Sequence, residues 1–233
     1  MCYNIGYCCC TLIDRRCFIL LEVIVNHDSN LQPIEVQAIL EGLREFLSLF
    51  PRRKIRYLGS TAVKDEVYLS ADSFLSSPHH FPRPNRRQYD GNSIIAAMER
   101  EASLSRKRPL QIFVTSEDLL PPSSRRANGR QYSLRVSSAQ NAVISVARLR
   151  RLSDEERTDA IKVMLWHELG RMLGAAQYLR IRTEQGRESH CLNQCAMMRV
   201  NDVSGCLEVS RSIKTWGRIY CPYCEHDIRM SSI

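Results

Sequence analysis

Apolar and polar positions divide the first part of the chain into a strand, a helix and a second strand. Segment 18–25 is rich in β-branched residues and almost continuously apolar, as is typical of a strand buried on both faces of a sheet. Pro33 then opens a stretch whose apolar residues recur at helical spacing as far as Pro51. A short apolar run at 54–58 follows. This order predicts the β-α-β opening of an α/β layer.

The middle of the chain alternates between proline-rich loops and short apolar runs. Three prolines within seven residues predict a loop over 71–90, which carries His79 and His80. We expect both imidazoles to be exposed. Further elements follow from the same pattern. They are a helix capped by Asn92, buried strands at 110–115 and 142–146, and an edge strand at 132–136.

The most clearly delimited element is a long helix that begins after Ser153. Ser153 and Glu156 have the spacing of a capping box, in which each side chain satisfies a backbone N–H of the first turn. The apolar residues continue for about 20 positions, and Gly174 is a typical C-terminal glycine. His167 and Glu168 are therefore predicted to lie in the last turns of a long buried helix.

His167, Glu168 and Gly174 match part of the metzincin zinc-protease pattern HExxHxxGxxH. In that pattern one helical turn places two histidines on the same face, and Glu acts beside the metal. The glycine lets the chain bend to deliver a third histidine. Here Arg171 stands at the second ligand position and Gln177 at the third. A guanidinium stays protonated and offers no lone pair, so Arg171 cannot bind a metal ion.

Four cysteines downstream form a second candidate metal site. Cys191 and Cys195 are separated by 25 residues from the pair Cys221 and Cys224. Two pairs of thiolates that converge can form a closed tetrahedral S₄ shell, the usual structural zinc site, in an element of about 190–228. The alternatives are unliganded buried thiols or a disulfide. If one ligand is misassigned, the candidate replacements are Cys206 and His226.

In combination, these motifs make the chain resemble the archaemetzincins, a branch of the metzincin metallopeptidases. The resemblance covers about 85–228 and includes three further segments. These are Arg87-Gln88-Tyr89, Val114-Thr115-Ser116-Glu117-Asp118-Leu119 and Val143-Ile144-Ser145-Val146-Ala147-Arg148-Leu149. It implies an α/β fold of the α+β type, a mixed twisted sheet packed on long helices, in one domain over 1–233. It also implies that Cys191, Cys195, Cys221 and Cys224 hold a structural zinc ion, and that Met197 is the Met-turn residue below a catalytic metal.

Three departures from the family pattern bear on activity. Arg171 and Gln177 replace ligands, and residues 178–189 are inserted where the family passes directly from its third His to Cys. His190 precedes Cys191 and is an alternative third ligand, but only two histidines are then recovered. Arg171 lies three residues after Glu168, so its charge is expected to neutralise the carboxylate that zinc would otherwise balance. In that case Glu168 is a structural partner and not a general base.

Composition narrows the class of protein. The chain has 233 residues, ten cysteines and a formal net charge of +8. With no visible signal peptide and no apolar run long enough for a bilayer, we expect a soluble, cytoplasmic monomer with reduced thiols. The run Cys8-Cys9-Cys10 has no assigned role. The basic charge is expected to be a solvated surface.

Three functional hypotheses follow. The leading one is an archaemetzincin-like protein with one structural zinc ion and an empty or impaired catalytic site. The second is an active peptidase that binds zinc through His167 and His190, uses Glu168 as base and acts on a peptide or protein. The third is a basic zinc-knuckle module that binds nucleic acid or an acidic protein, with salt-dependent affinity as its test.

Overall fold

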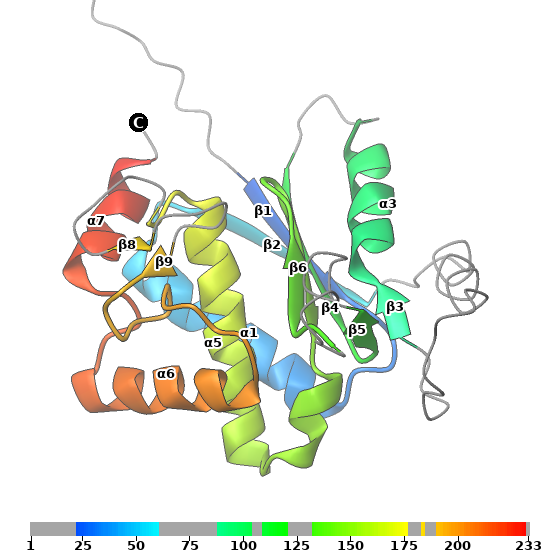
Figure 1. Cartoon of the computed structure of the whole chain (residues 1–233). Helices are drawn as coiled ribbons and strands as arrows, with labels where there is room; N and C mark the ends of the chain where they lie inside the picture. The colour runs from blue at the N-terminus through cyan, green and yellow to red at the C-terminus, as the bar shows by residue number, and fades with distance from the viewer. Residues whose placement is uncertain are drawn as a thin grey trace, which may run out of the picture.

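A five-stranded mixed sheet forms the centre of the protein, which is described here from a computed structural model (Figure 1). The structure describes residues 22–60, 88–103, 109–120, 132–176, 183–184 and 190–231. The strand order in the sheet is β2-β1-β4-β7-β6. The first four strands are parallel, and β6 is an antiparallel edge strand beside β7. The main-sheet strands are β1 (Glu22–His27), β2 (Lys54–Ser60), β4 (Leu110–Thr115), β6 (Arg135–Ser137) and β7 (Asn141–Ser145).

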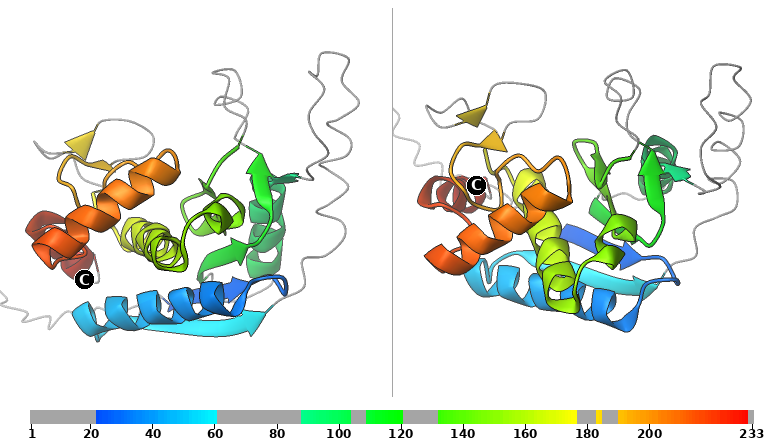
Figure 2. Two further views of the ribbon diagram at one scale, coloured as in Figure 1. Left: turned by 90° about the horizontal axis from the view of Figure 1, so that it is seen from below. Right: turned by 60° about the horizontal axis from the view of Figure 1, so that its bottom comes forward.

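Helices cover both faces of this sheet. Figure 2 shows α1 and α5 on one side and α3 on the other. The helices are α1 (Pro33–Leu49), α3 (Gly91–Ser103), the 3-10 helix η1 (Ala147–Arg151), α5 (Asp154–Met172), α6 (Val203–Trp216) and α7 (Pro222–Met230). None of the helices in the described part of the chain combines the length and the hydropathy that a membrane span requires.

The two faces follow from the two-residue period of the central strands. Ile112 and Val114 of β4 belong to the large core shared with α1 and α5, whereas Phe113 packs in a smaller core with Ile94 and Met98 of α3. Because successive strand residues point to opposite faces, a continuously apolar strand can serve both cores. The prediction of a mixed sheet packed on long helices is therefore confirmed.

Most predicted elements lie where the sequence pattern placed them, with local corrections. The capping box of α5 is present, since Ser153 accepts from the N–H of Glu156 and Glu156 reaches back to Ser153. The predicted cap of α3 is wrong: Asn92 lies inside the helix, and Asp90 accepts from the N–H of Asn92 and from the Ser93 hydroxyl. Residues 88–90, predicted as loop, form the short strand β3 (Gln88–Asp90), which pairs with β5 (Asp118–Leu120).

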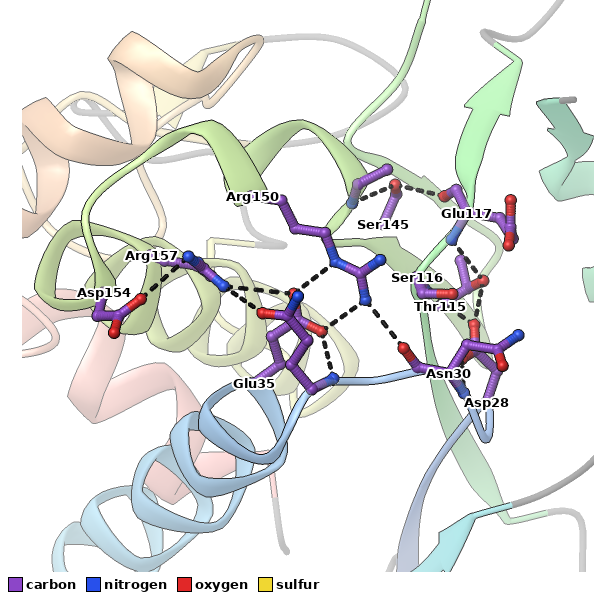
Figure 3. A network of polar contacts seen from close by, with 12 residues as sticks. Asp28, Asn30, Glu35, Thr115, Ser116, Glu117, Ser145, Arg150, Asp154 and Arg157 are labelled. Atoms are coloured by element: carbon purple, nitrogen blue, oxygen red, sulfur yellow. Dashed lines mark hydrogen bonds and ion pairs between the residues drawn. The ribbon is translucent and has the colours of Figure 1, made fainter. Parts of the chain in front are cut away.

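A buried polar network fixes the N-terminal end of α1 against η1 (Figure 3). Glu35, which is fully buried, accepts hydrogen bonds at 2.8 and 2.9 Å from Arg150. Arg150 also donates to the carbonyl of Asn30. In the neighbouring loop Asp28 accepts from the Thr115 hydroxyl and from the N–H of Ser116. Because η1 leads directly into α5, the network fixes the start of the helix that carries His167 and Glu168.

The C-terminal third packs along α5. Helix α6 lies against α5, and α7 ends the described chain (Figures 1 and 2). Between α5 and α6, β8 (Thr183–Glu184) pairs antiparallel with β9 (His190–Cys191). Part of the inserted segment 178–189 thus forms a strand beside His190.

Candidate metal centres

His167 is held in one orientation by the backbone of a later segment. Its side chain is 1 % exposed, and its Nδ1 lies 2.8 Å from the carbonyl oxygen of Ala196. Since a carbonyl only accepts, Nδ1 carries the proton, and Nε2 is left as the lone-pair nitrogen. Burial first, and then the charge of Arg135, lower the pKa of His167 well below 6.5. The imidazole is therefore neutral at physiological pH.

The second histidine proposed as a ligand lies beside the first. His190 is buried on β9, and its ring centroid is 5.4 Å from that of His167, with the planes inclined at 59°. Two imidazoles bound through nitrogen to one ion at about 2.1 Å would have ring centroids about 5 Å apart. Nε2 of His167 has no hydrogen-bond partner among the described residues. In their spacing alone, these two side chains fit a metal ion.

Glu168 does not fit a metal-assisted role, because two arginines already pair with it. Its side chain is fully buried, and its Oε2 is 2.8 Å from Nε of Arg171. Oε1 is 2.5 Å from Nη1 of Arg135. Burial alone would raise the pKa of Glu168, but the charges of Arg171 and Arg135 outweigh it and lower the pKa to about 2. The predicted Arg171–Glu168 pair is thus present, and a second pair accompanies it.

The two arginines connect helix α5 to edge strand β6 in opposite directions. Arg135 extends from β6 to the carboxylate on α5, whereas Arg171 extends from α5 and donates to the carbonyl of Ser138, just past β6, at 2.6 Å. We call Arg135, Glu168 and Arg171 the arginine clasp. Charged side chains therefore span the space between β6 and α5.

Close packing around Gly170 brings the segment that contains Met197 against α5. A Cβ added at Gly170 would lie 2.6 Å from Sδ of Met197 and 2.8 Å from Cε1 of Tyr220. Met197 is fully buried, and its carbonyl accepts from the N–H of Cys191. Gly174 has φ of 91°, in the left-handed region where glycine carries no Cβ penalty, so it turns the chain at the end of the helix as its place in the motif predicts.

Four thiols converge at the second candidate centre. The Sγ atoms of Cys191, Cys195, Cys221 and Cys224 all lie within 4.8 Å of one another, and all four residues are buried. Sulfur separations of 3.7 Å for Cys191–Cys221 and 4.0 Å for Cys195–Cys224 match the roughly 3.8 Å expected when Zn–S bonds of about 2.3 Å are arranged tetrahedrally. These separations are about twice a disulfide bond. The residues present therefore fit a four-coordinate zinc ion.

Hydrogen bonds and a helix terminus add to the fit. The backbone N–H of Asn193 donates to Sγ of Cys191, and the Asn193 amide donates to Sγ of Cys221. Mutual sulfur hydrogen bonds lower the pKa of Cys191 to about 7 and lower that of Cys221, while they raise those of Cys195 and Cys224. Ionising all four thiols at once thus requires a cation among them. Cys221 is the N-cap residue of α7 and Pro222 opens the helix, so this pair lies on the first helical turn.

The replacement ligands are not needed. Cys206 is buried on α6 outside the four-sulfur group, and burial raises the pKa of its thiol to about 12. His226 is exposed on α7. Gln177, His79, His80 and the Cys8-Cys9-Cys10 run lie outside the described residues. Sequence reasoning missed Arg135, whose only signal was its place in a predicted edge strand.

Comparison with known proteins supports the fold but gives no close relative. No protein-family model and no curated protein matches the chain. Among solved structures, the chain is similar to archaemetzincin from Methanopyrus kandleri, with a TM-score of 0.60. The two share 17% sequence identity, and the match covers 94% of this chain and 98% of the other. The chain therefore has the archaemetzincin fold, as its sequence motifs indicate.

Proposed function

We propose that this chain is a non-catalytic archaemetzincin-like protein, which keeps one structural zinc ion and has exchanged its catalytic metal for the arginine clasp. The single observation that supports this most strongly is the double ion pair of Glu168 with Arg135 and Arg171. A general base needs a pKa near the working pH and a free oxygen for the proton it removes. Glu168 has a pKa of about 2, and both of its oxygens are engaged.

The surroundings of His167 also oppose a catalytic ion. Metallopeptidase zinc is held by three protein donors and keeps one open position for water. The described residues bring together two imidazoles, and Arg135 lies close enough to His167 to lower its pKa. A buried dication would be repelled by this charge and by that of Arg171. We therefore assign no catalytic step to a metal here.

The cysteine centre has the opposite character. Cys191, Cys195, Cys221 and Cys224 would hold the zinc ion, which supplies a closed four-coordinate cross-link with no position for substrate. This cross-link joins the turn after β9 to the start of α7, 30 residues apart at Cys191 and Cys221. Reduced thiols are required, so we place the protein in a reducing compartment such as the cytoplasm.

One observation favours the alternative of an active peptidase. The rings of His167 and His190 have a separation that fits shared metal binding, and Nε2 of His167 is buried without a hydrogen-bond partner in the described part of the chain. For this alternative the clasp must open, and a further donor must come from water or from the Gln177 side chain. Glu168 would then regain a free oxygen.

Metal analysis of the purified full chain separates the two functions. We expect one zinc per chain, unchanged in His167→Ala and lost in Cys224→Ser, together with no cleavage of a mixed peptide library. The matched control is Cys206→Ala, which removes a buried thiol outside the cluster and should keep the zinc. Two zinc ions per chain, one of them lost in His167→Ala, would refute the proposal.

A further inference from the structure

The net charge of the arginine clasp equals that of the centre it replaces. In a metzincin centre a zinc dication beside one ionised Glu gives a net charge of +1. Here the single carboxylate of Glu168 faces two guanidinium groups, from Arg135 and Arg171, which again gives +1. The ligand motif accounts for only one of these two cations. Arg135 lies outside the motif, 33 residues before Glu168 in the chain.

Arg135 is buried, with its guanidinium paired to Glu168 and its charge close enough to act on His167. Its side chain is 7 % exposed, and its charge acts on Glu168, on His167 and on the Cys206 thiol. Strand pairing fixes its backbone, with Arg135 opposite Ile144 of β7, and the carbonyl of Arg135 accepts from the Ser133 hydroxyl at 2.6 Å. The side chain therefore starts from a rigid element and ends at the carboxylate.

We infer that Arg135 is the residue that excludes a metal ion from the His167–His190 pair, and that Arg171 alone does not. The inference rests on the proposed function, in which the centre holds no catalytic metal. Replacing Arg171 by a histidine supplies a donor one helical turn from His167, but it leaves the Arg135–Glu168 pair in place. A dication would then lie beside the buried guanidinium of Arg135, and the negative charge of Glu168 would already be neutralised by that guanidinium. Removing both guanidinium groups restores the charge balance of a metal centre.

The number of available donor atoms agrees with this role of Arg135. With Arg171→His, the introduced imidazole joins His167 and His190 to give three neutral nitrogen donors, the number that a catalytic zinc site uses. No change at Gln177 is then required. The ligand motif read alone leads to the opposite expectation, that positions 171 and 177 must both be restored and that position 135 has no effect.

The experiment measures zinc per chain in three variants of the full protein after gel filtration. We expect one zinc in Arg171→His, two in the pair Arg135→Gln/Arg171→His, and one in Arg135→Lys/Arg171→His. Gln and Lys both keep a hydrogen-bond donor for Glu168, but only Lys keeps the charge, so the last variant is the matched control. Adding His167→Ala to the Gln pair should return the ratio from two to one.

Three results would overturn the role of Arg135: two zinc ions in Arg171→His alone, two in the Lys pair, or one in the folded Gln pair. If the Gln pair is too unstable to purify, it is refolded with increasing zinc. Recovery of the native circular dichroism spectrum only above one equivalent supports the inference, and no recovery at two equivalents contradicts it. The proposed function fails separately, since a wild-type protein with two zinc ions refutes it whatever the variants do.

Discussion

The two candidate metal centres belong to the same fold, yet their surroundings have opposite charge. At the cysteine cluster, four buried sulfurs face one another and their pKa values are driven apart, so a dication would relieve the repulsion of thiolates. At His167, the neighbouring carboxylate of Glu168 is already paired with two guanidinium groups. Correctly spaced donor atoms are therefore not sufficient for metal binding. The charges of the other buried groups must also favour a cation at that position.

The largest expected effect is at the cysteine cluster. Cys224→Ser should abolish zinc binding and unfold the C-terminal third, because metal binding and folding are coupled and structural zinc contributes on the order of 10 kcal/mol in small zinc domains. Zinc content and thermal unfolding measure the effect. Cys206→Ala, also a buried thiol but outside the cluster, should keep its zinc and lose far less stability. Equal losses in the two variants would show that the cluster holds no metal.

The second largest loss of stability is expected when the arginine clasp is disrupted. Glu168→Ala leaves Arg135 and Arg171 without their shared carboxylate, and removing one partner of a buried ion pair costs about 3–5 kcal/mol. Urea unfolding at pH 7 measures the loss. The exposed ion pairs of Lys214 with Glu155 and Asp159 provide the comparison, since Lys214→Ala should cost less than about 1 kcal/mol. A similar small cost for Glu168→Ala would mean that the clasp is not formed in solution.

The clasp also predicts a pH dependence. The folded pKa of Glu168, about 2, lies below its ordinary value of 4.5, so the ionised carboxylate stabilises the folded state above about pH 5. This contribution, roughly 3 kcal/mol, is lost as the pH falls from 4.5 towards 2. In Glu168→Gln the corresponding part of the acid-induced loss should be missing. Parallel curves of unfolding free energy against pH for the two proteins would contradict the assignment.

The smallest expected loss of stability concerns the contact between Gly170 of α5 and Met197. Gly170→Ala places a Cβ 2.6 Å from Sδ of Met197 and should cost about 1–3 kcal/mol through overpacking. Gly205→Ala is the matched control, because a Cβ there would lie 3.5 Å from Oδ1 of Asp202, an ordinary van der Waals contact, and alanine favours a helix. A difference between their thermal midpoints tests the packing. If both variants are equally stable, Met197 does not lie against α5 as described.

The sequence predicted local features with short-range causes. The capping box at Ser153, the turn at Gly174 and the i,i+3 pair of Glu168 with Arg171 each depend on residues within one or two turns, and all are present. The four cysteines could be grouped because their spacing itself is diagnostic. Helices α6 and α7 were not predicted from the sequence.

Long-range partners could not be read in the same way. The contact between Arg135 and Glu168 joins residues 33 positions apart, and it exists because β6 folds back beside β7 and faces α5. Nothing in the residues around Arg135 distinguishes it from the other arginines of a chain with net charge +8. The proximity of His190 to His167 likewise depends on the pairing of β8 with β9. Charge balance at the centre therefore became visible only in the folded chain.

The most direct test of the account is to locate zinc in crystals of the full chain by anomalous scattering at the zinc edge. We predict one peak, centred among Sγ of Cys191, Cys195, Cys221 and Cys224 at about 2.3 Å from each. The density around Glu168 should show Arg135 and Arg171 paired with it. A second peak at about 2.1 Å from Nε2 of His167 would contradict the account.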